Sequence, residues 1–339
     1  MIMKLFRLFF VFIACAFAVT PALAEKPILT IYTYDSFTSD WGPGPAIEAN
    51  FEEVCKCDVQ FIGLDSSIGI LGRIQLEGDN SKADIALGLD TNLMHLAKQT
   101  GYFAELPTEI SSIINKNSSL PINFEDDVFM PFDWGWFGFV YKKDLISNPP
   151  QSFSDLLDLP DDMKIVIQDP RTATPGLGLL LWIKSIYGEE ASTYWQQLQP
   201  KILTVTKGWS EAYGLFLDGE ADMVLSYTTS PAYHLIAEED DNFDVAGFAD
   251  GHYLQIEVAA ILKNAPEPDL AIEFMKFIST PGFQQVIPTT NWMYPAFNTE
   301  LPEGFNSLFQ PEKSHLFDSE MVAVKQKEWI NEWLQSSTN

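Results

Sequence analysis

Short apolar runs alternate with amphipathic segments along most of the chain, and this pattern predicts strands that alternate with helices. Residues 28–34, with the sequence ILTIYTY, are typical of a buried strand because β-branched and aromatic side chains dominate them. The other strands expected in this first series are 59–62 and 84–88, and its expected helices are 42–54, 69–77 and 93–98. Such a series indicates a parallel sheet with helices on its faces.

A second series of the same kind begins near residue 135. Its expected strands are 137–141, 164–167, 202–205, 223–225 and 253–259, and its expected helices are a segment ending by Pro160, 176–187 and 210–217. Three later helices are expected at 269–278, 282–287 and 319–335. We therefore expect an α/β protein of two lobes, each a mostly parallel sheet flanked by helices. Because ligands bind beyond the carboxyl ends of such strands, the ligand site is expected in the cleft between the lobes.

The domain boundaries follow from the expectation that the late helices return to cover the first unit. Lobe 1 is then discontinuous and consists of residues 25–130 and 260–339. Lobe 2 is residues 131–259, and the chain crosses between the lobes near 126–141 and 247–259.

The first 24 residues read as an export signal. Lys4 and Arg7 give a positive start, residues 8–19 are an apolar stretch, and Ala22-Leu23-Ala24 fits the small-x-small cleavage pattern. A lipoprotein signal at Cys15 is the alternative, but the apolar stretch continues past it. Cleavage after Ala24 leaves no second apolar run long enough to span a bilayer, so we expect a soluble protein exported to the periplasm.

A formal net charge of −27 narrows the class of partner. Nucleic acid is excluded, because its binding proteins carry a basic surface. An acidic surface attracts cations, although solubility alone is the simpler reason for it.

The cysteine pattern leaves one choice open. After the signal, the cysteines are Cys55 and Cys57, and in an oxidising compartment they either close a small disulfide ring or remain two free thiols. A metal site is not expected, because there is no second cysteine pair and the 4 histidines lack ligand spacing.

Polar turns with hydroxyl groups follow several expected strands and precede helices. Thr174 leads into the helix 176–187, and Tyr227-Thr228-Thr229-Ser230 ends the strand 223–225 directly before Pro231. Free N–H groups at the start of a helix attract anions, so Thr174 and Ser230 are candidates for a shared anion pocket. The alternative is ordinary N-capping, in which each hydroxyl serves its own backbone.

Aromatic residues in expected loops are a second candidate feature. Tyr34, Trp209, Tyr227, Tyr233 and Trp292 all lie at strand ends or in loops. Most aromatic residues belong to cores, but a loop tryptophan between Gly208 and Ser210 suits the binding of a cation by its ring face.

No catalytic signature is found. The chain contains no G-x-S-x-G, H-E-x-x-H or phosphate-loop motif, and the acidic run 238–241 lacks the spacing of a calcium loop. We therefore expect no enzymatic activity, no catalytic residue and no cofactor.

Several long motifs resemble those of the periplasmic thiamine-binding proteins of bacterial ABC importers. They are YTYDSF with WGPGP, SKADIALGLD, QDPRTATPGLGLLLW, TKGWSEAYGLFL, VLSYTTSPAYH, GHYLQIEVAA and NWMYP, in order along the chain. The resemblance implies a type II periplasmic binding protein that closes around thiamine, thiamine monophosphate or thiamine diphosphate. It also implies that the ligand passes to a membrane permease driven by an ATPase.

The resemblance also implies the ligand-binding residues. They are Tyr34, Ser66, Ser67, Ala173, Thr174, Trp209, Tyr227, Thr228, Thr229, Ser230, Tyr233 and Trp292. Two positions depart from the family pattern. Ala173 stands where relatives have serine, and the loop 64–67 stands where relatives have two acidic residues and then glycine, which leaves open whether Asp65, Ser66 or Ser67 faces the ligand.

Three alternatives share this architecture. A ferric-ion or a polyamine binding protein could use the tyrosine-rich turns, although ferric binders need clustered tyrosinates with histidine or carboxylate. A thiaminase-like transferase needs a cysteine nucleophile in the cleft, whereas Cys55 and Cys57 follow an expected helix of the first unit.

Overall fold

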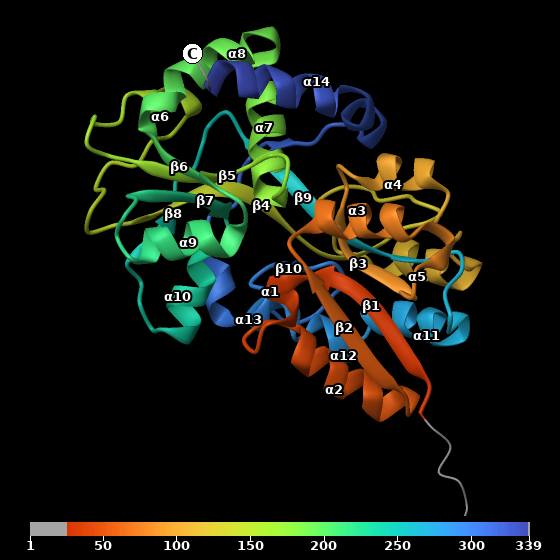
Figure 1. The fold of residues 1–339 in the computed structure, drawn as a ribbon. Coiled ribbons are helices and arrows are strands. Elements are labelled where there is room, and N and C mark those ends of the chain that lie inside the picture. The colour runs from red at the N-terminus through yellow and green to blue at the C-terminus, as the bar shows by residue number, and fades with distance from the viewer. Residues whose placement is uncertain (1–25, 338–339) are drawn as a thin grey trace, which may run out of the picture.

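The computed structural model describes residues 26–337, so the expected export signal lies outside the described residues. The strands form one mixed sheet in the order β2-β1-β3-β9-β4-β7-β5-β6, with β8, β10 and β11 pairing at the side. No helix within residues 26–337 is both long and apolar enough to cross a membrane. Figure 1 shows helices on both sides of the two ends of this sheet.

The first end of the sheet is parallel and is formed by the N-terminal segment. β1 (Ile28–Tyr34) lies between β2 (Asp58–Leu64) and β3 (Ile85–Asp90) and runs parallel to both. The helices of this segment are α1 (Asp35–Thr38), α2 (Gly44–Cys55), α3 (Ser67–Glu77), α4 (Met94–Thr100) and α5 (Thr108–Asn117). All residues of β3 are buried, as expected for a parallel strand covered on both faces.

Two long antiparallel strands connect the two ends of the sheet. They are β4 (Met130–Lys142) and β9 (His252–Ile261). β9 pairs with β3 through residues 257–261, while β4 pairs with β7 (Met223–Tyr227) through residues 137–141. β9 therefore pairs with the first end of the sheet and β4 with the second, the two strands pair with each other, and Figure 1 shows them passing between the two lobes.

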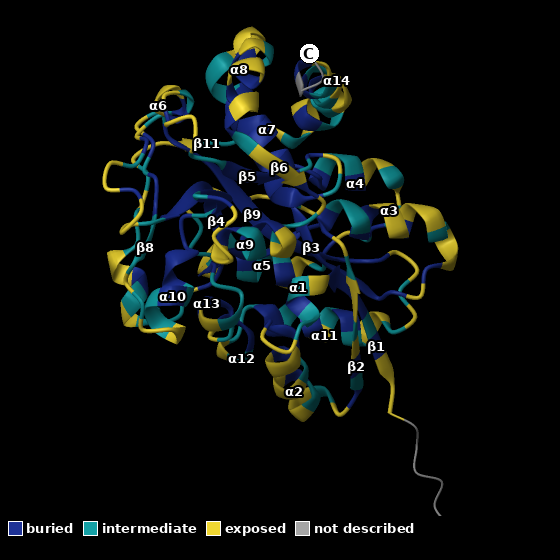
Figure 2. Cartoon of the chain, turned by 60° about the vertical axis from the view of Figure 1, so that its left-hand side comes forward, coloured by how far each residue is buried: buried dark blue, intermediate teal, exposed yellow. Residues whose placement is uncertain are grey.

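The second end of the sheet is again parallel. β5 (Ile165–Gln168) runs parallel to both β6 (Ile202–Thr206) and β7. Its helices are α6 (Phe153–Leu157), α7 (Thr174–Tyr187), α8 (Ala191–Leu198), α9 (Trp209–Leu217) and α10 (Pro231–Ala237), and β8 (Phe243–Val245) pairs with β4. In Figure 2 the central strands are buried, whereas the outer faces of α2, α3 and α8 are exposed.

The late helices divide between the two ends. α11 (Pro268–Ile278) and α12 (Pro281–Gln284) pack against α2, as expected for a return to the first unit, and α13 (Ile287–Thr290) leads into β10 (Tyr294–Pro295). The last elements are β11 (Ser314–His315) and α14 (Ser319–Ser337). α14 packs on α8 and α7 as well as α4, and its Trp329 and Trp333 lie in the hydrophobic core of the second end. This helix therefore contacts helices of both ends of the sheet, α7 and α8 of the second and α4 of the first.

The hydrophobic pattern predicted the main elements well. The strand 28–34 has its expected bounds, and the helix expected at 176–187 begins at Thr174. The two short helices α5 and α8 were not expected from the pattern. Cys55 and Cys57 form a disulfide bond, so the ring is present and the free thiols are not.

Candidate ligand-binding site

The start of α3 meets the start of α7 across the two lobes. The hydroxyl of Thr174, the first residue of α7, donates a 2.9 Å hydrogen bond to the hydroxyl of Ser67, the first residue of α3. Ser66 is the N-cap of α3, and its hydroxyl donates a 2.5 Å hydrogen bond to the carbonyl of Thr172 in the loop before α7. Ala173 is the N-cap of α7 and has no side-chain oxygen to cap it. Two helix N-termini with their hydroxyls thus face each other.

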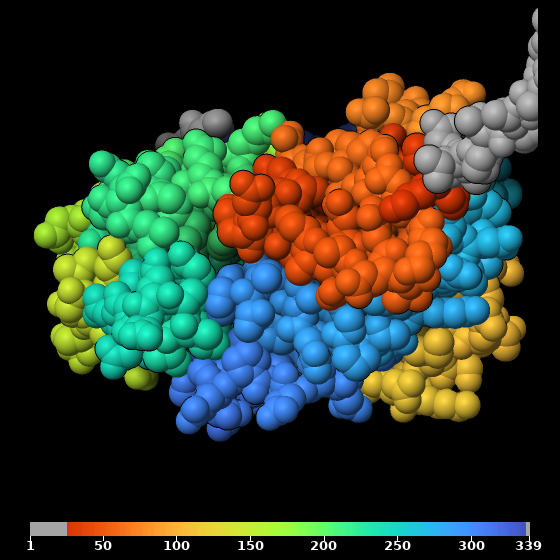
Figure 3. Space-filling view, turned by 90° about the horizontal axis from the view of Figure 1, so that it is seen from below, coloured from red at the N-terminus to blue at the C-terminus, as the bar shows by residue number. Residues whose placement is uncertain are grey.

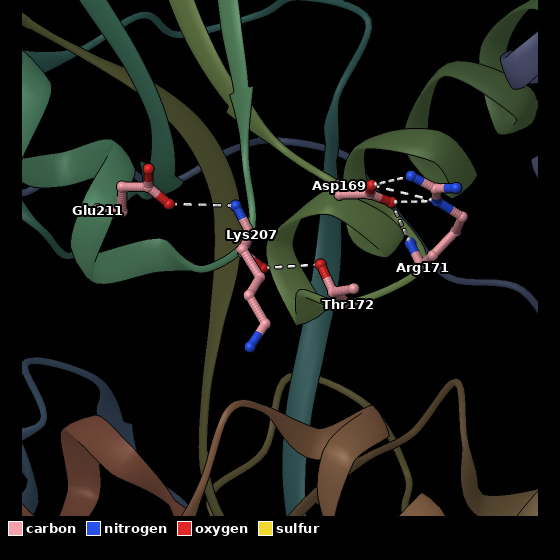
Figure 4. Close-up of polar contacts among 5 residues, drawn as sticks. All are labelled: Asp169, Arg171, Thr172, Lys207 and Glu211. Atoms are coloured by element: carbon pink, nitrogen blue, oxygen red, sulfur yellow. Dashed lines mark hydrogen bonds and ion pairs between the residues drawn. The ribbon is translucent and has the colours of Figure 1, made fainter.

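The start of α9 joins this arrangement through the loop that precedes it. The hydroxyl of Thr172 donates a 2.8 Å hydrogen bond to the carbonyl of Lys207, and the Lys207 N–H donates to Glu211 in the first turn of α9 (Figure 4). The neighbouring Arg171 side chain is held by the carboxylate of Asp169. Because these bonds tie the loops after β5 and β6 together, the N-termini of α7 and α9 keep a fixed relation to each other.

An exposed ion pair closes the rim of the same region. Lys207 Nζ lies 2.5 Å from Asp65 Oδ2, and both side chains are about two-thirds exposed. Figure 4 shows the Lys207 side chain pointing away from the second lobe toward the first. Asp65 therefore makes a contact between the lobes, whereas Ser66 and Ser67 lie at the start of α3.

Trp209 is the first residue of α9, and its ring packs against a second aromatic ring. Its ring stacks on Tyr213 with centroids 4.9 Å apart, and its Nε1 donates a 2.8 Å hydrogen bond to the Ser226 hydroxyl. Because Trp209 is only half-buried, a ligand can reach its ring, while the stack and the hydrogen bond fix the ring's orientation.

The turn 227–230 is more occupied by internal bonds than its sequence suggests. The Ser230 hydroxyl lies 2.7 Å from the Ser226 hydroxyl and accepts from the Tyr227 N–H, and the Thr229 hydroxyl contacts Met293 Sδ at 3.7 Å. The Thr228 hydroxyl is fully buried and has no hydrogen-bond partner among residues 26–337. Of the three hydroxyls in this turn, Thr228 therefore has the free hydrogen-bonding capacity.

Tyr233 and Trp292 form an aromatic corner between the lobes. Their ring centroids lie 5.4 Å apart at an angle of 74°. Trp292 has a positive φ of 56°, a backbone conformation that costs a bulky residue about 1–3 kcal/mol. Its N–H donates to the carbonyl of Ile287 at 3.0 Å, which holds this conformation. Strain kept in this way is typical of ligand clamps.

Tyr34 lies at the end of β1, where its hydroxyl reaches a buried acid. It donates a 2.7 Å hydrogen bond to Glu257 and accepts a 2.9 Å bond from Asn291. The ring needs the glycine at position 88, because a Cβ there would lie 2.5 Å from the Tyr34 ring, and Gly88 also has a φ of +102°.

Three buried carboxyl groups lie close to these aromatic residues, and the sequence analysis assigned them no role. Asp90, Glu257 and Asp133 are direct cross-strand neighbours on β3, β9 and β4. Burial raises the pKa of Asp90 to about 6 and that of Asp133 to about 7, and burial together with the charge of Asp133 raises the pKa of Glu257. Acidic residues inside the apolar runs MPFDWGWF and LQIEVAA were the available signal.

The structure brings the candidate residues together in two groups. The hydroxyl group joins Ser66, Ser67, Ala173 and Thr174, with Trp209 following on the same linked loops. The aromatic group joins Tyr34, Tyr227, Tyr233 and Trp292 through the carboxyl groups, Asn291 and Met293. In Figure 3 atoms of the first lobe, in red and orange, lie directly against the green second lobe.

Two sheet-and-helix lobes, joined by two long strands and meeting through polar and aromatic residues, define a protein that encloses a small solute. The chain belongs to the bacterial extracellular solute-binding proteins, whose family profile matches residues 39–285. It is 51% identical to the thiamine-binding periplasmic protein of Salmonella typhimurium over 313 residues, which are 92% of this chain and 94% of that protein. The family resemblance read from the sequence motifs is therefore confirmed.

Solved structures give the same fold. A structure described as a periplasmic thiamin binding protein superposes with a TM-score of 0.88 at 48% identity and covers 93% of this chain and 97% of that chain. The ferric binding protein from Campylobacter jejuni superposes with a TM-score of 0.73 at 21% identity, covering 91% of this chain and 99% of that chain, which shows the shared fold alone. The expected type II periplasmic binding fold is confirmed.

Proposed function

We propose that this protein captures thiamine, thiamine monophosphate or thiamine diphosphate between its two lobes. The observation that carries the proposal is that residues of the two lobes contact each other within each candidate group, in a chain that shares 51% identity with a thiamine-binding periplasmic protein. The ligand-binding residues proposed are those expected from the sequence: Tyr34, Ser66, Ser67, Ala173, Thr174, Trp209, Tyr227, Thr228, Thr229, Ser230, Tyr233 and Trp292.

The chemistry of the two groups fits the two ends of such a ligand. Thiamine has a positively charged thiazolium ring, which aromatic faces such as those of Trp209, Tyr233 and Trp292 attract. The phosphate esters add an anion, which suits the starts of α3, α7 and α9 because free N–H groups and the helix dipole favour negative charge there. Trp209 begins α9 and lies between the two groups along the chain of contacts, so it is one of the aromatic residues proposed to contact the thiazolium ring.

We propose a transport role, with delivery of the ligand to a membrane permease driven by an ATPase. The named relatives are periplasmic binding proteins, and the same location is proposed here, with the export signal cleaved after Ala24. A thiaminase-like reaction is disfavoured because the two cysteines among residues 26–337, Cys55 and Cys57, are joined in a disulfide and supply no thiolate.

The proposed lobes are residues 25–130 with 260–339, and 131–259, with crossings near 126–141 and 247–259. The crossings fit β4 and β9, which pair with each other and connect β3 of the first end to β7 of the second. The contacts of α14 with α7 and α8 argue for moving this helix to the second lobe. Limited proteolysis followed by mass determination of the fragments tests these boundaries.

Isothermal titration calorimetry tests the function directly. The mature protein is denatured to release any small molecule, which mass spectrometry identifies, and is then refolded and titrated with thiamine, its two phosphate esters, ferric citrate and spermidine. Binding of thiamine or its esters, with no heat from iron or spermidine, supports the proposal. Binding of iron or spermidine without binding of thiamine contradicts it.

A further inference from the structure

The three buried carboxyl groups form a row across the sheet where the two lobes join. Glu257 of β9 lies directly opposite Asp90 of β3 and directly opposite Asp133 of β4. Asp90 and Asp133 are fully buried, and Glu257 is 6% exposed. Like charges directly opposite each other destabilise a sheet, and buried charges without a partner cost more. The row is therefore a costly arrangement that needs a reason.

No positive side chain balances the row. None of the three carboxyl groups takes part in an ion pair among residues 26–337. Asp90 Oδ2 and Asp133 Oδ1 also have no hydrogen-bond partner there. The three carboxyl groups are neighbours, but they are not placed so that they could hold a metal ion together. The same is true of every other set of three His, Cys, Asp or Glu side chains in the described part of the chain.

The row touches the proposed aromatic site directly. The Tyr34 hydroxyl donates to Glu257, and the side chain of Asn291, next to Trp292, donates to Asp133 at 2.6 Å. Tyr227 reaches the row through Gln255, whose amide donates to Glu257 at 3.0 Å. A ring held by these aromatic residues would therefore lie close to the carboxyl row.

We propose that the carboxyl row Asp90–Glu257–Asp133 is the counter-charge for a positively charged ring in the ligand, and that it makes the site prefer a cationic ligand to a neutral one of the same shape. This inference rests on the proposed function and adds a determinant of specificity to it. Charges interact strongly in a site from which water is excluded, so a positive ring offsets the repulsion within the row.

Occupation by a cation also changes the protonation of the row. The titratable groups that face it are Tyr34, Tyr227 and Tyr253, whose pKa values burial raises, so all three stay neutral. The raised pKa values of Asp133 and Glu257 mean that the row holds protons near neutral pH. A cation that binds above the row lowers these pKa values and releases protons.

The test compares thiamine with its neutral isostere in which a thiophene ring replaces the thiazolium ring. The variants are Asp133→Asn and Asp90→Asn, in which the new amide nitrogen can take the place of the oxygen that has no hydrogen-bond partner. The matched control is Asp241→Asn, which removes an exposed carboxylate from the loop before β8. Affinities are measured by calorimetry on ligand-stripped protein whose circular dichroism spectrum matches that of the wild type.

We expect the wild type and Asp241→Asn to bind thiamine at least about tenfold more tightly than the isostere. In Asp133→Asn and Asp90→Asn this preference falls about tenfold, while the affinity for the isostere changes little. If the wild type binds both probes equally tightly, or if the preference survives in both variants, the counter-charge inference is overturned while the proposed function stands. If the wild type binds neither probe, the proposed function itself fails.

A second measurement needs no variant and covers the case in which both variants fail to fold. Thiamine is titrated into the wild type near pH 7 in two buffers with different ionisation enthalpies. A difference in the observed heat that corresponds to protons released on binding supports the inference. Equal heats in both buffers overturn it, because a cation above partly protonated carboxyl groups must displace protons.

Discussion

Thr174 in α7 donates its hydroxyl hydrogen to the hydroxyl of Ser67 in α3, at 2.9 Å, so the starts of two helices from opposite lobes are joined by one hydrogen bond. Both side chains are buried. A phosphate group placed here would meet N–H groups and hydroxyls from both lobes, so its binding would also hold the lobes together.

We therefore expect Thr174→Val to weaken the binding of thiamine diphosphate by about tenfold and to leave thiamine nearly unchanged. Valine keeps the shape of threonine and removes the hydroxyl. Thr108→Val is the matched control, because Thr108 is the exposed first residue of α5 and is not among the proposed ligand-binding residues. Calorimetry with both ligands checks this, and equal losses for the two ligands would remove Thr174 from the phosphate site.

Trp209→Ala should weaken the binding of thiamine by about tenfold or more, since it removes a ring face that attracts the cation. The Tyr213 ring on which Trp209 stacks stays in place, so the variant should fold. Trp41→Ala is the control, because Trp41 is an exposed tryptophan of the first lobe with 54% of its surface accessible. Unchanged affinity in Trp209→Ala would show that Trp209 does not contact the ligand.

The exposed ion pair between Lys207 and Asp65 should act on the release of the ligand. Because it closes the rim between the lobes, Lys207→Met and Asp65→Asn should each raise the dissociation rate by about two- to fivefold, and the effect should vanish in high salt. Stopped-flow tryptophan fluorescence measures the rate. Lys325→Met breaks a similarly exposed pair on α14 and should leave the rate unchanged. A salt-independent change in Lys207→Met would argue against the ion pair as its cause.

Ala173→Ser should stabilise the protein by about 1 kcal/mol, because the N-cap of α7 lacks a side-chain oxygen and serine is a preferred capping residue. Ala173 has extended backbone angles, φ −125° and ψ 137°, that suit a capping side chain. Urea unfolding of the ligand-free protein measures the change. Ala173→Val adds bulk without a hydroxyl and should give no gain, and an equal gain in both variants would exclude capping as the reason.

The carboxyl row predicts opposite pH dependences for stability and for binding. The raised pKa values, about 6 for Asp90 and about 7 for Asp133, mean that the protonated row contributes stability at low pH, which is lost as the pH rises through these values. The free energy of unfolding of the ligand-free protein should thus fall between about pH 4, the ordinary pKa of an aspartate, and about pH 7, and less steeply in Asp133→Asn.

Thiamine affinity should rise over the upper part of the same range, because the ionised row attracts the cation. Urea unfolding and calorimetry at several pH values check the two trends. A ligand-free stability that does not depend on Asp133 in this range would show that its carboxyl group is ionised in the folded protein throughout.

Much of the fold could be read from the hydrophobic pattern because the central strands are buried on both faces. β1 and β3 stand out as apolar runs, and the proline and glycine residues around 42–45 mark the start of α2. Short helices such as α8 were missed, because eight residues carry too little periodic signal to separate them from a loop. The last helix was expected on the first lobe, since its tryptophan stripe shows that one face packs but not against which partner.

The candidate site was predictable only in part. Ser66, Thr174 and Trp209 lie at strand-to-helix turns, where position alone points to ligand contact, and the family motifs supplied the rest. Asp133 and Glu257 lie inside strands, and their place in the site depends on the register of β4 against β9. Pairing register involves residues far apart in the chain, so no local pattern reveals it.

The sequence by itself determined the class of fold, the alternation of strands and helices, and the identity of the hydroxyl and aromatic residues at the strand ends, because these depend on local periodicity and short motifs. Only the tertiary structure decided that Ser67 is hydrogen-bonded to Thr174, that α14 packs on α7 and α8 of the second lobe, and that three carboxyl groups are cross-strand neighbours. The physical reason is that these relations are set by the crossing of β4 and β9 between the lobes, which brings distant segments together.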